Sequence, residues 1–222
     1  ARTVERMLPD IIGKPLMMNV SGGIPCVLLD AGYPLLALKG VPLLARTASL
    51  VAQRLAWAPS EVEKAFKVAL TMNLAMLELQ GVLARQDRPP TTEQRVELRT
   101  HPMRSVQMLG AAGVRDEDWL RAVLQHHEVE DGSGYPAGRS DVCELASLVR
   151  RADTYTSKLS ARSSREAMAA DAAGRAMFMQ DPGHPMTQAL VKEFGIYPTG
   201  SHVRLASGAL AAGVASGRSI TP

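Results

Sequence analysis

The chain has 222 residues and a mass of 23.8 kDa, enough for one domain with a proper hydrophobic core. Hydrophobic residues make up 46% of it and aromatic residues only 4%, so Leu, Ala, Val and Met have to fill that core. The net charge of +3 comes without a dominant run of Lys or Arg, which gives no reason to expect a nucleic-acid partner. The two cysteines, Cys26 and Cys143, form no C-x-x-C motif, and no secretory signal or membrane-spanning run is evident, so we expect a cytoplasmic protein without a membrane segment.

The first half of the chain predicts two long helices after an irregular start. Residues 1–41 carry an apolar pattern that prolines interrupt, and we expect this segment to pack on the core. A helical pattern follows over residues 42–56. A turn with Pro59 then opens a second helix, which is nearly all apolar after Phe66 and is predicted to run to about Leu79 as the buried central helix.

Further helices follow a loop at Asp87 to Pro90. Thr92 opens one of them, and the dipeptide His101-Pro102 is predicted to begin another, which ends near Leu109. The pattern over residues 116–128 is amphipathic and predicts a helix that ends close to two adjacent histidines.

The last third predicts three more helices, over residues 142–159, 164–179 and 185–194, and then a small β-hairpin from His202 to Val214. The fold class is therefore expected to be mainly α. We divide the chain into an N-terminal segment (1–41), a helical domain (42–195) and a C-terminal hairpin with tail (196–222).

The stretch Leu124 to Pro136 reads LQHHEVEDGSGYP and is the richest in chemistry. His126 and His127 close the predicted helix, and a glycine-rich turn follows them. Neighbouring side chains on a helix point about 100° apart, so both histidines serve one site only at its rim, or else they bind different ions. The residues alone leave two readings open: a metal site or a solvated helix end.

The pattern HHE-x-x-DGSGYP resembles the signature of the HD-GYP family, bacterial metal-dependent phosphodiesterases that open cyclic di-GMP. Further matches follow in the same order along the chain: His101-Pro102 upstream, Arg151 to Tyr155 downstream, and the closing segment Gly195 to Leu205. The resemblance implies the helical bundle of an HD domain, and it covers the chain from about residue 60 to its end.

The sequence departs from the family pattern on the central helix. There Met72 and Asn73 occupy the positions of the His-Asp dipeptide that gives the family two metal ligands, and Ala75 and Met76 replace its Gly and Lys. The chain also has no histidine before His101, so a ligand on the preceding helix is missing as well. A thioether is a poor ligand for iron or manganese, and an amide lacks the charge of a bridging carboxylate.

The resemblance carries four ligand positions over to this chain: His101, His126, His127 and Asp153. We expect these to hold no metal, or to bind Fe or Mn weakly, and a competent two-metal centre is not expected. Glu78, one turn beyond Asn73, is a candidate replacement ligand, although an acid on the far face of the helix is the simpler reading.

The leading hypothesis is a catalytically inactive, degenerate HD-GYP domain in cyclic di-GMP signalling. It would act as an interaction module and contact a GGDEF-type diguanylate cyclase through the GYP loop, which consists of Asp131, Gly132, Ser133, Gly134, Tyr135 and Pro136. Two alternatives remain open: a phosphodiesterase with an altered metal centre, and a receptor that binds cyclic di-GMP without cleaving it. In the receptor, Arg162 and Arg165 would contact phosphate.

Overall fold

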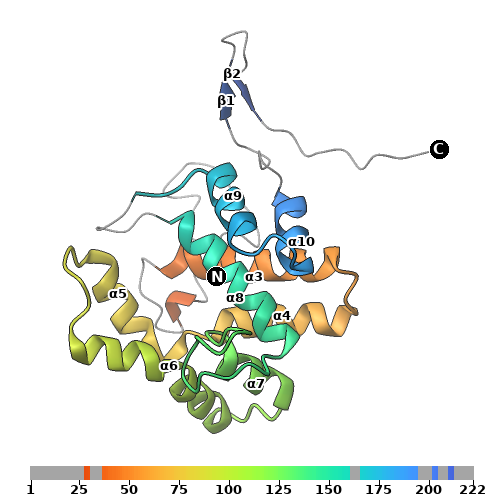
Figure 1. Ribbon diagram of the computed structural model, residues 1–222. Helices are drawn as coiled ribbons and strands as arrows, with labels where there is room; N and C mark the ends of the chain where they lie inside the picture. Colours follow the sequence, from red (N-terminus) through yellow and green to blue (C-terminus); the bar gives the residue numbers. More distant parts are fainter. Residues whose placement is uncertain (1–27, 31–36, 161–165, 195–201, 205–209, 213–222) are drawn as a thin grey trace, which may run out of the picture.

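Figure 1 shows the computed structural model of the chain, which describes residues 28–30, 37–160, 166–194, 202–204 and 210–212. Its helical elements, in chain order, are α3 (Ala37–Arg54), α4 (Pro59–Thr71), the 3-10 turn η1 (Leu74–Met76), α5 (Leu77–Arg85), α6 (Thr92–Ala111), α7 (Glu117–Gln125), α8 (Glu144–Lys158), α9 (Ala170–Gln180) and α10 (Pro185–Phe194). The mainly α fold class predicted from the sequence is confirmed.

The C-terminal strands are short. β1 (His202–Arg204) and β2 (Leu210–Ala212) pair in antiparallel register, with Val203 opposite Ala211. Residues 205–209 between them lie outside the described residues, as does most of the N-terminal segment 1–41. The predicted hairpin and the predicted division into three units therefore stay predictions.

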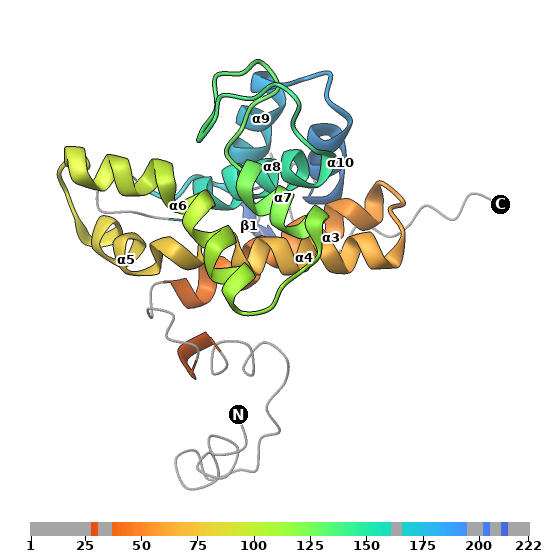
Figure 2. The same ribbon diagram turned by 90° about the horizontal axis from the view of Figure 1, so that it is seen from below.

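The core forms where α3 and α4 lie side by side and α8 packs across both (Figures 1 and 2). Small side chains let these helices approach closely, and five alanines of α3 and α4 are at most 2% exposed: Ala45, Ala48, Ala52, Ala65 and Ala69. Tyr155 of α8 is among the largest buried side chains, and its ring stacks on Phe194 of α10. The aromatic-poor composition thus gives an alanine-rich helical core.

The central helix is shorter than predicted, because α4 ends at Thr71 instead of continuing to about Leu79. Met72 and Asn73 form a turn, after which η1 and α5 follow. The N–H of Ala75 donates to the Ser105 hydroxyl of α6 at 3.1 Å. This contact is made between distant parts of the sequence, so the local apolar pattern could not reveal the break.

By length and composition alone, the stretch Pro59–Arg85 is long and apolar enough to cross a membrane, contrary to the prediction from the sequence. The turn at Met72 and Asn73 interrupts it, however, and Val68 and Ala69 pack in the main core cluster. Core helices of globular folds are commonly long and apolar in the same way, and α4 contributes buried residues to the core of the bundle.

Helix α6 corrects a second prediction. It runs without interruption from Thr92 to Ala111, so His101-Pro102 lies inside a helix and does not begin one. The helix starts with a capping box in which the hydroxyl of Thr91 accepts the N–H of Gln94 and the Gln94 side chain accepts the N–H of Thr91. With α5, its first half extends to one side of the body (Figures 1 and 2).

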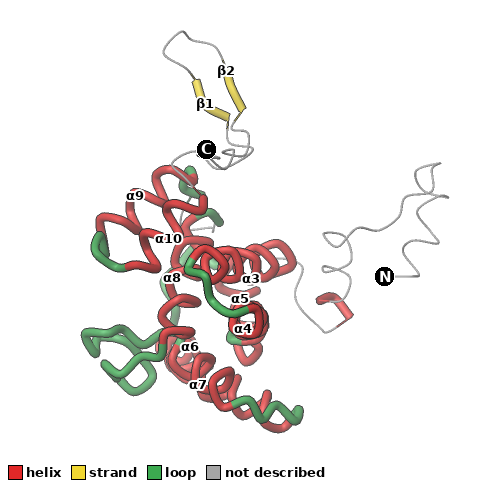
Figure 3. Tube along the Cα trace, turned by 90° about the vertical axis from the view of Figure 1, so that its right-hand side faces the viewer, coloured by secondary structure: helices red, strands yellow, loops and turns green. Residues whose placement is uncertain are grey.

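Helix α7 begins after Asp116, whose carboxylate accepts the N–H of Trp119, and it ends at Gln125. The connection from α7 to α8 contains no helix (Figure 3). Helix α9 begins at Ala170 rather than Ser164, because residues 166–169 are not helical and 161–165 lie outside the described residues. Helix α10 has the predicted bounds.

Candidate metal site and adjoining cleft

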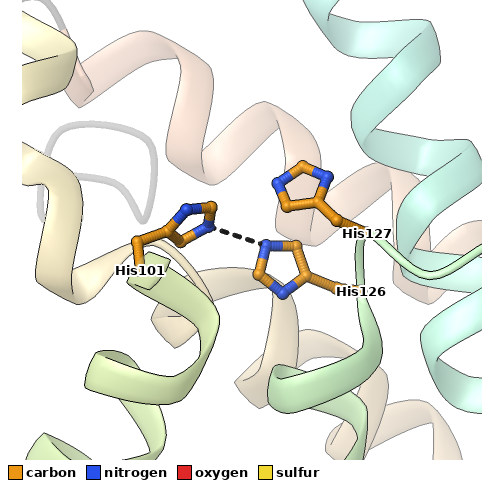
Figure 4. Close-up of side chains that lie close together, drawn as sticks. All are labelled: His101, His126 and His127. Carbon is orange, nitrogen blue, oxygen red and sulfur yellow. Dashed lines mark hydrogen bonds between the residues drawn. The ribbon is translucent and has the colours of Figure 1, made fainter. Parts of the chain in front are cut away.

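Three histidines from two helices gather at one point of the bundle (Figure 4). His101 comes from the middle of α6, and His126 and His127 follow the end of α7. One ring nitrogen from each lies within 4.8 Å of the others. The side chains of His101 and His126 are fully buried, whereas His127 is half-buried. The two adjacent histidines thus lie in one cluster with His101, just beyond the end of α7 at Gln125.

Backbone carbonyls orient the two buried rings. Nδ1 of His101 lies 2.7 Å from the carbonyl oxygen of Leu98, and Nδ1 of His126 lies 2.6 Å from that of Val123. A carbonyl oxygen only accepts, so in each ring Nδ1 carries the hydrogen and donates it. Each Nε2 is then an unprotonated nitrogen with a lone pair.

These two Nε2 atoms face each other at 3.1 Å (Figure 4). Burial lowers the pKa of His101 to about 4 and that of His126 to about 3, and it lowers the pKa of His127 strongly, so all three rings are neutral near pH 7. Two lone pairs pointing at each other repel unless a cation lies between them. Nitrogen ligands stand about 2.1 Å from an ion such as zinc, and two around one tetrahedral ion are then about 3.4 Å apart, close to the observed 3.1 Å. The cluster therefore fits one metal ion.

A cleft of about 590 Å³ adjoins the cluster and reaches it at His127. This volume lies within the usual range of small-molecule sites. Its walls come from α3, α5, the α5–α6 connection, α6, the GYP loop and α8. Among the lining residues with polar side chains are Asn73, Gln80, Arg88, His127, Tyr135 and Asp153.

The other predicted site residues lie at the cleft or away from it. Asp153 lines the cleft, which His127 also lines, and the group of three histidines does not include it. Met72 is fully buried in the main core cluster, whereas Asn73 opens into the cleft. Glu78 is exposed on α5 and does not line the cleft, which agrees with its simpler reading.

The GYP loop folds back onto the site. The N–H of Tyr135 donates to the carbonyl of His127 at 3.1 Å, and the Tyr135 ring stacks on the His127 ring with 4.5 Å between centroids. The Arg99 guanidinium lies over the Tyr135 ring, 5.4 Å from its centroid. Burial and the nearby charge of Asp153 raise the pKa of the Tyr135 hydroxyl, which keeps it protonated. Tyr135 thus belongs to the wall of the cleft.

A buried carboxylate fixes the far side of this loop. Glu128 is 1% exposed, and its two oxygens accept the N–H groups of Ala137 and Arg139 at 2.7 and 3.0 Å. No role for Glu128 was predicted from the sequence. The signal in the sequence is its place directly after the two histidines, in HHE.

A second network that the sequence did not reveal joins this loop to the C-terminal helices. Arg151 is 4% exposed and pairs with Glu130 at 3.0 Å and with Asp181 at 2.6 Å. Ser147 donates to Glu130 as well. The predicted phosphate contacts Arg162 and Arg165 lie outside the described residues.

A family model described as HD domain matches residues 30–181, which is more than half of the chain. The chain therefore belongs to the HD domain family.

Two relatives refine this placement. The chain is 35% identical over 118 residues to the protein named cyclic di-GMP phosphodiesterase PA4108 from Pseudomonas aeruginosa, an alignment that covers 51% of this chain and 28% of that protein. Its fold is similar to that of Bd1817, described as an HDG"Y"P protein from Bdellovibrio bacteriovorus, with a TM-score of 0.56 and 20% identity. That match covers 71% of this chain and 51% of the other, so the chain spans about half of the solved structure and less than a third of the phosphodiesterase. It is an HD-GYP-like domain related to a cyclic di-GMP phosphodiesterase.

Proposed function

We propose that this domain binds cyclic di-GMP in the cleft beside a single metal ion and cleaves it slowly or not at all. The observation that carries the proposal is the three-histidine cluster with two Nε2 atoms 3.1 Å apart, next to a cleft of about 590 Å³. The relationship to a cyclic di-GMP phosphodiesterase supports the choice of ligand. The neutral Asn73 and the core-buried Met72 support the loss of a second metal position.

His101, His126 and His127 would hold the ion. Three neutral imidazoles suit iron or zinc better than manganese, which prefers carboxylate oxygens. When bound, the ion supplies positive charge that attracts a phosphate group and polarises its oxygens. The chain itself contributes a wall for the ligand, through the Tyr135 ring, and a carboxylate in the cleft, Asp153.

Metal content tests the site. The protein is purified from iron- and zinc-supplemented cultures and measured by elemental mass spectrometry. We expect one ion per chain in the wild type and in Asp153→Asn, and a loss of the ion in His126→Ala. Two ions per chain would contradict the single-ion site and would favour the phosphodiesterase with an altered two-metal centre. No ion in the wild type would overturn the metal part of the proposal.

Ligand binding is tested by calorimetric titration with cyclic di-GMP. We expect Leu83→Trp to weaken binding, since Leu83 lines the cleft, and the neighbouring Val82→Trp to leave binding unchanged, since Val82 is 46% exposed and does not line it. The protein is then incubated with cyclic di-GMP, and chromatography of the nucleotide shows whether the protein cleaves it, as an enzyme would, or leaves it intact, as a receptor would. Linear product that disappears in His126→Ala would show a working phosphodiesterase, and no binding in the wild type would overturn the proposal.

A second candidate function is a partner contact through the GYP loop, and the exposed side chains of that loop favour it. Asp131, Ser133 and Pro136 are exposed, and the Asp131 carboxylate holds the turn by accepting the N–H of Ser133 at 2.8 Å. Tyr135 is unsuitable for the test, because its substitution would also disturb the stack on His127.

The partner would be a GGDEF-type diguanylate cyclase domain. We expect Ser133→Arg to weaken binding to such a domain in a biolayer assay, and Ser140→Arg, an exposed serine outside the GYP loop, to bind as the wild type does. Equal binding by both variants, or no binding by the wild type, would contradict this second function.

A further inference from the structure

Pro102 lies directly after the buried ligand His101, in the interior of α6. In an α-helix the N–H of each residue donates to the carbonyl four residues earlier, and for residue 102 that carbonyl belongs to Leu98. Proline has no N–H, so this bond cannot form. The carbonyl of Leu98 is the one that accepts Nδ1–H of His101 at 2.7 Å.

His126, the other buried histidine, also donates Nδ1–H to a backbone carbonyl, but that carbonyl is free for a different reason. Helix α7 ends at Gln125, so the carbonyl of Val123 is among the last four of the helix, which lack an intrahelical partner. It accepts Nδ1–H of His126 at 2.6 Å. In both cases the carbonyl three residues before the histidine fixes which ring nitrogen carries the hydrogen. At His126 the helix end frees that carbonyl, and at His101 proline does.

We propose that Pro102 is a positioning residue of the metal site: by withdrawing a backbone N–H from the Leu98 carbonyl, it reserves that carbonyl for His101. The ring is then held with Nδ1 protonated and Nε2 turned toward Nε2 of His126. This inference rests on the single-ion site proposed above. It gives a physical reason for a buried proline in the middle of a 20-residue helix, where proline otherwise removes a hydrogen bond and crowds the preceding turn.

The variant Pro102→Ala restores the competing N–H. Metal ligands that lose an outer hydrogen bond commonly lose at least about tenfold in affinity. We expect zinc to bind Pro102→Ala about tenfold more weakly than the wild type. The chain offers a matched control in Pro42, the proline inside α3, which does not line the cleft. Pro42→Ala should keep zinc affinity within about twofold of the wild type.

A second measurement reports which nitrogen of the His101 ring carries the hydrogen. The chain has five histidines, so long-range ¹⁵N–¹H NMR spectra of the metal-free protein can be assigned with His101→Gln and His126→Gln. We expect His101 of the wild type to show a single form with Nδ1 protonated, and Pro102→Ala to show a mixture of both tautomers. A change of stability alone would not move this signal. Pro102→Ser introduces the same N–H and should reproduce both effects.

The possible results separate this inference from the proposed function. Unchanged zinc affinity and an unchanged His101 tautomer in Pro102→Ala would overturn the role of Pro102 and leave the single-ion site standing. A wild type that binds no ion would overturn the site. The NMR spectra, recorded without metal, would in that case still decide whether Pro102 selects the tautomer.

Discussion

The backbone around Gly134 leaves no room for a side chain. A Cβ atom built there would lie 2.5 Å from the carbonyl oxygen of His127, from Cα of Glu128 and from the nitrogen of Val129. All three are backbone atoms, so no side chain can turn away to make space. The glycine therefore lets the GYP loop close onto the segment that carries the histidines.

We expect Gly134→Ala to lower the free energy of unfolding by roughly 2–4 kcal/mol, because overpacking against backbone forces the loop to shift. Urea denaturation measures this change. The control is Gly110→Ala in α6, where a new Cβ meets nothing within 4 Å and alanine should stabilise the helix by up to about 1 kcal/mol. Equal stability of both variants would show that the loop does not pack as described.

The site residues differ in how far the sequence could predict them. His126, His127 and the GYP loop stand together in the sequence, so the signature identified them. His101 was predicted from the resemblance, but its environment was not, because a helix start and a helix interior bury a side chain very differently. The presence of Asp153 in the same cleft as His127 depends on how α8 crosses the bundle. The spacing of residues in the sequence does not predict how α8 crosses the other helices.

At the scale of elements, Arg151 ties three segments together. It extends from α8 to Glu130 beside the GYP loop and to Asp181 at the end of α9, and it is nearly fully buried between them. Burial alone would raise the pKa of Glu130, but hydrogen bonds from Ser147 and Arg151 outweigh it and lower that pKa to about 2. The folded state therefore holds Glu130 as a carboxylate.

This network predicts a dependence on acid. A carboxyl whose pKa is lowered on folding stabilises the protein above its ordinary value of 4.5, and this contribution is lost as the pH falls from 4.5 to about 2. The Glu130 side chain is 39% exposed, so solvent screening limits the effect to about 1 kcal/mol.

We expect Glu130→Gln to be less stable than the wild type at pH 6, with the difference shrinking toward pH 2. Denaturant titrations at several pH values measure it. Glu166→Gln, at an exposed position outside the helices, serves as the control and should show no such trend. A constant difference across this pH range would argue against an ionised Glu130 in the network.

Two helices show why element boundaries were mispredicted. The apolar pattern after Phe66 continues through Met72, yet α4 ends at Thr71, and the N–H of Ala75 donates to Ser105 of α6. Proline commonly marks a helix start, yet Pro102 lies inside α6. In both cases the local preference of the sequence did not decide where the helix begins or ends.

At the scale of the whole molecule, the proposed ion would link α6 to the end of α7, since its ligands come from both. An ion that binds only the folded state stabilises that state by mass action. At a free zinc concentration about 100-fold above Kd, the gain is about 2.7 kcal/mol, which for a chain of this size raises Tm by about 5–10 °C.

We therefore expect chelation to lower the Tm of the metal-loaded protein by this amount, and zinc to restore it. Differential scanning calorimetry measures both steps. His126→Ala should unfold at the same temperature with and without chelator. A wild type that is indifferent to chelation would argue against an ion shared by the two helices.

The sequence by itself determined the helical class, through hydrophobic periodicity, and the family, through HHE-x-x-DGSGYP. Those features are local, so a linear pattern can carry them. Only the tertiary structure decided that His101 meets His126 and His127 while Asp153 lines the adjoining cleft, that Met72 joins the core while Asn73 faces the cleft, and that Arg151 joins the loop to α9. These relations depend on distances between segments far apart in the chain, which are fixed by how the helices pack.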